Sequence, residues 1–173
     1  MARDIIMEAD KCLGCGSCEL ACAIFHSASQ NLFTAVREDP LPLSRIRVDM
    51  IGEEALPTLC RHCEYAPCID ACMASAMHRE EEGHLVLVDK ERCVGCWMCV
   101  MVCPFAAIVL DSNHKKAVKC DKCPSEEIPW CVSWCPTNAI RCGEIEDLNQ
   151  AALRERAERF SLPLFGSAQH RKA

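Results

Sequence analysis

The chain has few aromatic residues and no recognisable substrate-converting motif. Phe, Trp and Tyr make up 5% of its 173 residues, so an ordinary apolar core would be small, because aromatic side chains supply much of the buried area in most domains. The sequence contains no Gly-rich phosphate loop, no paired carboxylate set and no Ser/His/Asp arrangement. We therefore expect a protein without a substrate-converting site of its own.

Basic stripes and an export signal are also missing. The formal net charge is −6 and the pI is about 5.5, which disfavours nucleic-acid binding and with it a DNA-binding redox sensor. The first residues, MARDIIMEADKC, contain neither a basic region followed by an apolar run nor a twin-arginine pair. We therefore expect a cytoplasmic protein, in which thiols stay reduced and a disulfide scaffold is disfavoured.

Cysteine, in contrast, is abundant, and sixteen of the seventeen cysteines fall into four groups of four. Groups one and three share the spacing C-x2-C-x2-C-x3-C and consist of Cys12, Cys15, Cys18 and Cys22, and of Cys93, Cys96, Cys99 and Cys103. Group two, C-x2-C-x4-C-x3-C, consists of Cys60, Cys63, Cys68 and Cys72. Group four, C-x2-C-x7-C-x3-C, consists of Cys120, Cys123, Cys131 and Cys135. This internal repeat indicates a fold organised around the cysteines.

Group three lies in an uncharged stretch, residues 93–110, that is long enough on hydropathy alone for a membrane helix. Four cysteines at ligand spacing and Pro104 interrupt this stretch. A helix that must satisfy its own backbone in lipid fits such a segment poorly. We expect instead an apolar sheath around a metal site.

The elements between the groups are expected to be short. The alternation of apolar and polar residues, together with β-branched side chains, predicts four strands, at residues 46–51, 84–89, 107–111 and 116–120. The last two flank a turn and predict a hairpin. Short helices are expected to begin around the last cysteine of each group, as in CELACAIF (18–25) and CVMVCPF (99–105). Good helix formers throughout residues 147–160 predict a helix, which Asp147 could cap. Two prolines in residues 38–44 predict an irregular loop.

The cysteine spacing predicts iron–sulfur clusters. A C-x2-C-x2-C run suits three irons of one cubane cluster, and the fourth cysteine of this run ligates the other cluster in two-cluster ferredoxins. Clusters are therefore expected in pairs, each pair held by two groups that exchange one ligand. The alternative is a multi-zinc interaction module, but structural zinc sites commonly use two separated C-x2-C pairs, which fits a triplet followed by a distal cysteine poorly.

With these groups in place, residues 5–146 resemble the four-cluster 4Fe-4S ferredoxin-like electron-transfer subunits of bacterial oxidoreductases. Members of this family include the iron–sulfur subunits of formate dehydrogenases, hydrogenase complexes and DMSO reductase. The stretches CRHCEYAPCIDACMASAM (60–77) and CVGCWMCVMVCPFAAI (93–108) are most similar to the ferredoxin-like subunit that serves anaerobic carbon monoxide dehydrogenase. Cys22 and Cys72 lack the proline that follows Cys103 and Cys135, so the loops there depart from the family pattern, whereas the ligand positions match it.

The resemblance implies four ligand sets, each joining three cysteines of one group to the fourth cysteine of another. The first cluster would be held by Cys12, Cys15, Cys18 and Cys135, and the second by Cys120, Cys123, Cys131 and Cys22. The third would be held by Cys60, Cys63, Cys68 and Cys103, and the fourth by Cys93, Cys96, Cys99 and Cys72. Some relatives have a tryptophan in place of a group-three cysteine and carry a three-iron cluster. Trp97 replaces no cysteine, so four 4Fe-4S clusters are expected.

The expected fold class is α+β, with two interleaved ferredoxin-like halves of two clusters each, short strands, short helices and long loops. Residues 1–54 and 113–146 would form the half of groups one and four, and residues 55–112 the half of groups two and three. Residues 147–173 would add a C-terminal helix and tail, the candidate for partner docking.

The resemblance implies that the protein relays single electrons from a catalytic oxidoreductase to an acceptor. The expected donor is carbon monoxide dehydrogenase, with formate dehydrogenase, a formate–hydrogen system or a hydrogenase as alternatives. The acceptor would be a hydrogenase or an NAD(P)-reducing flavoprotein. Each cluster with its thiolates carries about −2, so four clusters bring the formal −6 to roughly −14. An acidic holo-protein of this kind would dock on basic partner surfaces, including those of a membrane-bound partner.

A few residues outside the ligand sets also merit attention. Cys142 is expected to be a small buried hydrophobe in a strand, with a reactive or partner-bridging thiol as the alternative. His62, between two cysteines of group two, is expected to face solvent or to lie beside a cluster, not to ligate it. Five basic residues adjoin ligand cysteines and are expected to be solvated charges, with tuning of cluster potentials as the alternative: Lys11, Arg61, Arg92, Lys119 and Lys122.

Overall fold

The computed structural model describes residues 4–80 and 84–161. Within these ranges the strands pair into four antiparallel two-stranded sheets: β1 (Asp4–Met7) with β8 (Ile140–Gly143), β2 (Arg47–Ile51) with β3 (Glu54–Thr58), β4 (Met77–Arg79) with β5 (Val86–Val88), and β6 (Ile108–Asp111) with β7 (Lys116–Lys119). The helices are η1 (Ala9–Lys11), α1 (Ser17–Phe25), α2 (Leu32–Ala35), α3 (Pro67–Asp70), α4 (Met98–Val102), α5 (Trp130–Ser133) and α6 (Ile145–Ser161). The expected α+β class is confirmed.

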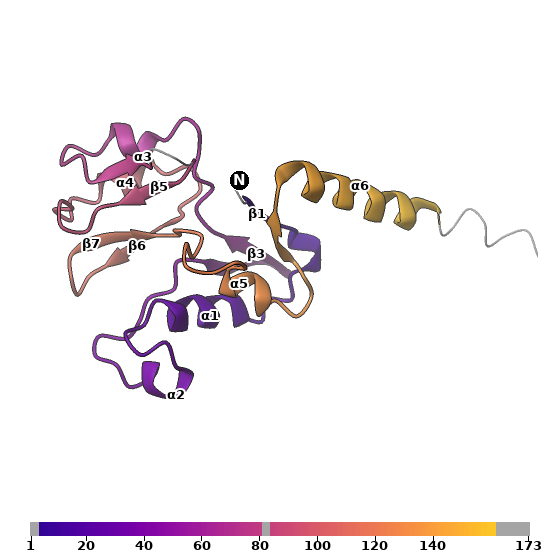
Figure 1. Ribbon diagram of the computed structural model, residues 1–173, viewed down its shortest axis with the longest axis horizontal. Coiled ribbons are helices and arrows are strands. Elements are labelled where there is room, and N and C mark those ends of the chain that lie inside the picture. Colours follow the sequence, from indigo (N-terminus) through magenta and orange to yellow (C-terminus); the bar gives the residue numbers. More distant parts are fainter. Residues whose placement is uncertain (1–3, 81–83, 162–173) are drawn as a thin grey trace, which may run out of the picture.

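Short helices pack in two pairs that occupy different parts of the molecule. Helix α3 packs against α4, close to β5, β6 and β7, whereas α1 packs against α5 in the part that also contains α2 (Figure 1). Each part has its own small apolar core, and cysteines belong to both. One core contains Cys18, Cys22, Ile46, Leu59, Cys131 and Ile140, and the other contains Met77, Cys99, Ile108 and Ala117. The cysteines thus take the place of the large side chains that the sequence lacks.

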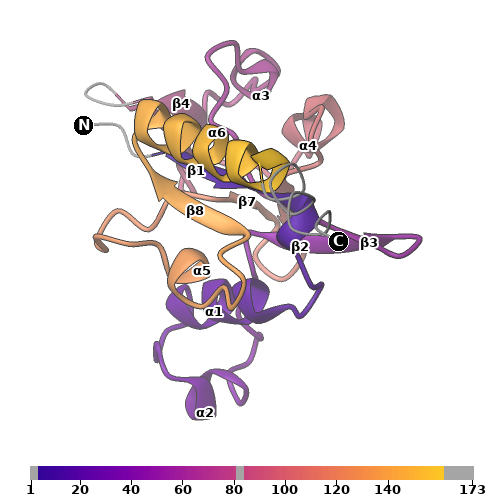
Figure 2. The same cartoon turned by 90° about the vertical axis from the view of Figure 1, so that its right-hand side faces the viewer.

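The two ends of the described chain meet in the β1–β8 sheet. Ile5 lies opposite Cys142 and Met7 opposite Ile140, and helix α6 follows directly and packs against β8 (Figure 2). This pairing brings groups one and four to the same part of the molecule. The division into halves at 54/55 and 112/113 stays a prediction, and both boundaries fall inside a hairpin: β2–β3 spans the first and β6–β7 the second.

Most of the expected elements are present. Strands β2, β5, β6 and β7 occupy the predicted segments, β6 and β7 form the predicted hairpin, and residues 38–44 contain no helix or strand. Helix α6 is present but begins at Ile145, so Asp147 lies in its first turn, and the prediction that Asp147 caps it is wrong. The predicted tail, from residue 162 onward, lies outside the described residues.

The short helices are present, and in groups one and three they begin within one residue of the expected segments 18–25 and 99–105. Each helix begins one residue before the third cysteine of its group: Ser17 precedes Cys18, Pro67 precedes Cys68, Met98 precedes Cys99 and Trp130 precedes Cys131. In groups one and three the preceding residue, Gly16 or Trp97, is left-handed, with φ of 70° or 65°. This residue reverses the chain out of the cysteine loop and into the helix.

The uncharged stretch 93–110 is divided between a loop, the five-residue helix α4 and strand β6. Across residues 4–80 and 84–161, no helix is both long and apolar enough to cross a membrane. The expectation of an apolar sheath around a metal site stays a prediction.

Candidate iron–sulfur centres

The loops of groups one and three share one backbone shape. Gly14 and Gly95 occupy equivalent positions before the second cysteine and have φ of 67° and 70°. A Cβ on Gly95 would lie 2.2 Å from the carbonyl oxygen of Lys115, whereas a Cβ on Gly14 would meet only the flexible side chain of Met50 at 3.0 Å and that of Ala55 at 3.4 Å. Glycine is therefore required more strictly in group three, where the loop lies against the β6–β7 hairpin.

One cavity is lined by Cys72 of group two and by three cysteines of group three, Cys93, Cys96 and Cys99. Met77, Val88, Trp97 and Ala117 provide part of its apolar wall. These four cysteines are the set expected for the fourth cluster. Burial raises the pKa of the Cys99 thiol to about 11, and the charges of Cys93, Cys68 and Cys72 add to this rise.

A second cavity is lined by three cysteines of group two, Cys60, Cys63 and Cys68, together with Cys103 of group three. His62, Val86 and Phe105 belong to its wall, and the guanidinium of Arg61 lies 4.5 Å from the centre of the Phe105 ring. These four cysteines are the set expected for the third cluster. Groups two and three thus exchange their fourth cysteines between two neighbouring cavities.

Cys22 of helix α1 lies among the cysteines of group four. Burial raises the pKa of the Cys131 thiol well above its ordinary value, with further contributions from the charges of Cys120, Cys22 and Cys123. Burial likewise raises the pKa of Cys120 to about 12 and that of Cys123 to about 11, and Cys22 contributes to both shifts. Cys22 and Cys131 share one core with Cys120 packed against it. His26, whose Nδ1 lies 3.7 Å from the Cys22 sulfur, also has a ring nitrogen within 4.8 Å of the Cys123 sulfur.

The first set gathers around the core that contains Cys18. Burial raises the pKa of Cys18 to about 12, and the charge of Cys12 adds to it. Cys135 packs against the same core as Cys18, and Cys15 is exposed. The shared core and the β1–β8 pairing thus bring Cys135 to the part of the molecule that contains group one.

Backbone amides point at several of the cysteine sulfurs. N–H groups donate to Cys22 from Arg45 at 3.2 Å, to Cys72 from Ala76 at 3.2 Å, and to Cys103 from Ala107 at 3.5 Å. A thiolate accepts such bonds far better than a neutral thiol does, because it carries a charge. First cysteines accept such bonds as well, Cys60 from His62 at 3.4 Å, Cys93 from Ala117 at 3.5 Å and Cys120 from Lys122 at 3.4 Å. Backbone donors therefore surround both the first and the exchanged fourth cysteines.

The four sets of cysteine thiols fit a cluster with a cationic core. Buried thiols with raised pKa values lose their protons only when a positive charge replaces them, and metal binding supplies this charge. None of the cysteines is in a disulfide. Sets of four sulfurs around an apolar cavity, with amide donors behind them, are the environment that 4Fe-4S clusters use.

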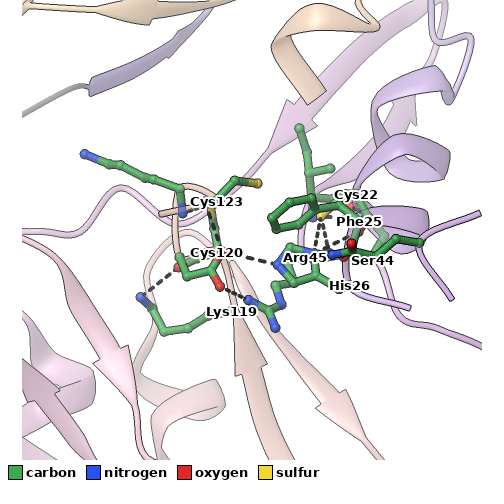
Figure 3. A network of polar contacts seen from close by, with 12 residues as sticks. Cys22, Phe25, His26, Ser44, Arg45, Lys119, Cys120 and Cys123 are labelled. Carbon is green, nitrogen blue, oxygen red and sulfur yellow. Dashed lines mark hydrogen bonds and ion pairs between the residues drawn. The ribbon is translucent and has the colours of Figure 1, made fainter. Parts of the chain in front are cut away.

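A polar network that the sequence did not reveal joins group one to group four. Asp121 forms ion pairs with Arg45 and with His26, whose Nε2 lies 3.3 Å from the Asp121 carboxylate. The His26 Nδ1 lies 2.8 Å from the carbonyl oxygen of Cys22. Figure 3 shows the residues from the α1 side facing Cys120 and Cys123 across this network. Burial opposes the charge on His26, but its bonds to Asp121 and Cys22 raise its pKa to about 9.

Lys119 departs from expectation, whereas His62 follows the second of its two expected alternatives. Lys119 is 2% exposed and is therefore not a solvated charge. His62 is 5% exposed and lies in the wall of the cavity expected for the third cluster instead of facing solvent. Burial and the charges of Lys119 and Lys122 lower the pKa of His62 to about 3. Arg92 is exposed as expected, whereas Lys11 pairs with Glu8 and Lys122 with Asp4. Cys142 is in strand β8, half-buried.

The chain is similar to known iron–sulfur proteins over most of its length. Residues 52–145 match the family model of the 4Fe-4S dicluster domain. An iron-sulfur protein of Rhodospirillum rubrum is 40% identical over 87% of this chain and 86% of its own. The electron transport protein HydN of Escherichia coli K12 is 35% identical over 90% of this chain and 96% of its own length. The thiosulfate reductase electron transfer subunit PhsB of Salmonella typhi is 32% identical over 83% of this chain and 76% of its own length.

Proposed function

We propose, from the premise that this chain belongs to the 4Fe-4S dicluster domain family, that it carries four 4Fe-4S clusters and relays single electrons through them. Its relatives support the more general description of the chain as an iron–sulfur protein of the electron-transfer type. When bound, the clusters supply the one-electron chemistry. The chain's own residues supply ligation, spacing and the local electrostatics that set the potentials.

One observation carries this proposal. Two neighbouring cavities are each lined by four cysteines, three from one group and the fourth from the other. This arrangement is what ligand exchange between paired clusters requires. The group of Cys22 with Cys120, Cys123 and Cys131 supports the same scheme for the second cluster, and we propose Cys12, Cys15, Cys18 and Cys135 as ligands of the first.

The partner would be the catalytic subunit of an oxidoreductase, since PhsB is by name an electron transfer subunit of a thiosulfate reductase, and we propose that this partner is the electron donor. Carbon monoxide dehydrogenase, the donor suggested by the cysteine segments, is one candidate, and formate dehydrogenase or a hydrogenase is another. We propose a hydrogenase or a flavoprotein as acceptor. The chain itself would act as a carrier, without converting a substrate. Sixteen reduced thiols need a reducing compartment, so we propose a cytoplasmic location.

Metal analysis of the protein purified without oxygen tests this function. We expect about 16 iron and about 16 inorganic sulfide per chain, and a brown protein that bleaches on reduction. A colourless protein with stoichiometric zinc would instead identify the multi-zinc interaction module. The protein that co-purifies under the same conditions identifies the donor: a carbon monoxide dehydrogenase supports the first candidate, and a different oxidoreductase replaces it.

A further inference from the structure

The histidine between Cys60 and Cys63 has a defined protonation pattern. The Nδ1 atom of His62 accepts a hydrogen bond of 3.0 Å from the backbone N–H of Val86. An acceptor nitrogen carries no proton, so the ring is the neutral tautomer with its proton on Nε2. This conclusion follows from the direction of the bond, because a backbone amide can only donate.

The Nε2–H of His62 is a buried donor that needs an acceptor. Within the described part of the chain, it finds no hydrogen-bond partner. Buried polar groups are nearly always satisfied, and His62 belongs to the wall of the cavity formed by Cys60, Cys63, Cys68 and Cys103. The sulfurs of a cluster in this cavity would be the acceptors that the ring lacks.

Lys119, which precedes Cys120 of group four, reaches Val86 in the wall of the same cavity. Its ammonium donates to the carbonyl oxygen of Val86 and, at 3.3 Å, to that of Cys120, beside which it lies in Figure 3. Val86 therefore binds both side chains, His62 through its N–H and Lys119 through its carbonyl. Carbonyl oxygens do not neutralise the ammonium, and no carboxylate among the described residues forms an ion pair with it.

The two side chains lie between two ligand sets. His62 follows Cys60 of the third set and Lys119 precedes Cys120 of the second. Lys119 donates to the carbonyl of Val86, which lines the cavity of the third set, and to that of Cys120 of the second set, so the two sets approach each other here. An electron that passes from one pair of clusters to the other would pass this junction.

We propose that His62 and Lys119 form a buried polar junction between the third and second clusters, in which the His62 Nε2–H donates to a sulfur of the third cluster and the Lys119 ammonium offsets the negative charge of both. Hydrogen bonds to cluster sulfurs and nearby positive charge favour the reduced form and raise the potential. The junction would thus make the middle of the relay easier to reduce. This inference rests on the proposed ligand sets.

Anaerobic redox titrations followed by electron paramagnetic resonance test the junction. His62→Leu removes the donor, and we expect one midpoint potential to fall by about 59 mV, which equals a tenfold change in the one-electron equilibrium constant. His62→Gln can both accept from Val86 and donate, so it should restore most of the shift. Lys119→Met should lower two midpoints. His78→Leu and Lys90→Met, at exposed positions, are the matched controls and should change none.

Iron and sulfide are measured in every variant. Wild-type protein without clusters would refute the proposed function itself. A complete set of clusters with all midpoints unchanged in His62→Leu and Lys119→Met would overturn the junction alone, as would equal shifts in the control variants.

A second measurement does not depend on the assembly of the His62→Leu variant. The His26→Gln variant is labelled with 15N only at histidine. The substitution removes the histidine that lies beside Cys22. Pulsed electron paramagnetic resonance should still detect a 15N coupling to a reduced cluster, and its absence in cluster-loaded protein would overturn the role of His62.

Discussion

The two pairs of cysteine groups are assembled by different means. Groups two and three are neighbours in the sequence, and hairpins β4–β5 and β6–β7 follow them directly, so short connections close both cavities. Groups one and four lie near opposite ends of the described chain. They are joined by the β1–β8 sheet, by the packing of α1 on α5 and by the ion pairs of Asp121 with Arg45 and His26.

The difference follows from chain entropy. Bringing distant segments together costs more than closing a short loop, and fixed polar and sheet contacts offset that cost. The more distant pair has these additional contacts. Exposure does not separate the pairs, because Cys15 of group one and its counterpart Cys96 of group three are both exposed. Substitutions in the two pairs should therefore have different consequences.

The largest effect is expected for the ligand that links the distant pair. Cys22→Ala should remove the cluster nucleated by Cys120, Cys123 and Cys131, leaving about 12 of 16 irons, because the missing thiolate belongs to group four's cluster. The spectrum of the reduced protein should lose the same component in Cys22→Ala and in Cys123→Ala. Cys142→Ala, outside the four groups, is the control and should retain about 16 irons. Loss confined to the component that Cys12→Ala removes would contradict ligand exchange.

The equivalent glycines of groups one and three allow a direct comparison of the two pairs. Gly95→Ala combines a left-handed backbone with a Cβ placed 2.2 Å from the Lys115 carbonyl, and we expect it to lower the free energy of unfolding by about 3 kcal/mol. Gly14→Ala has the same backbone strain, but Met50 can move, so a loss of about 1 kcal/mol is expected. Anaerobic denaturant unfolding measures both. Equal losses would show that the β6–β7 hairpin does not constrain group three.

The smallest of the three effects concerns the polar network of the distant pair. Asp121→Ala leaves Arg45 and His26 without their carboxylate, and we expect a loss of about 2 kcal/mol. Asp49→Ala removes the ion pair of Asp49 with Arg47, whose side chains are 45% and 55% exposed; solvent screening limits this loss to about 0.5 kcal/mol. The same unfolding measurement applies. If both substitutions have the same effect, the network does not hold the distant pair together.

The sequence predicted the features that depend on local spacing. The cysteine groups, the β6–β7 hairpin and helix α6 could be identified because turn residues, alternation and ligand spacing are local patterns. The exact first residue of each helix was not predictable in this way. In groups one and three a left-handed residue, Gly16 or Trp97, precedes the helix, and a tryptophan in that conformation carries no sequence signal.

Long-range contacts were beyond sequence reasoning. Asp121 meets Arg45 and His26 from 76 and 95 residues away, and no spacing rule relates such positions. The burial of His62 and Lys119 has the same origin, since Val86 binds both from a third segment. A charged residue beside a ligand cysteine is ordinarily solvated, so only the fold distinguishes Lys119 from the exposed Arg92.

The central claim, four clusters held by exchanged cysteines, is tested most directly by native mass spectrometry of the protein isolated without oxygen. We predict a holo-protein whose mass exceeds that of the chain by four 4Fe-4S units, and a Cys22→Ala variant that exceeds it by three. A holo-protein with two such units, or with zinc in their place, would contradict the account.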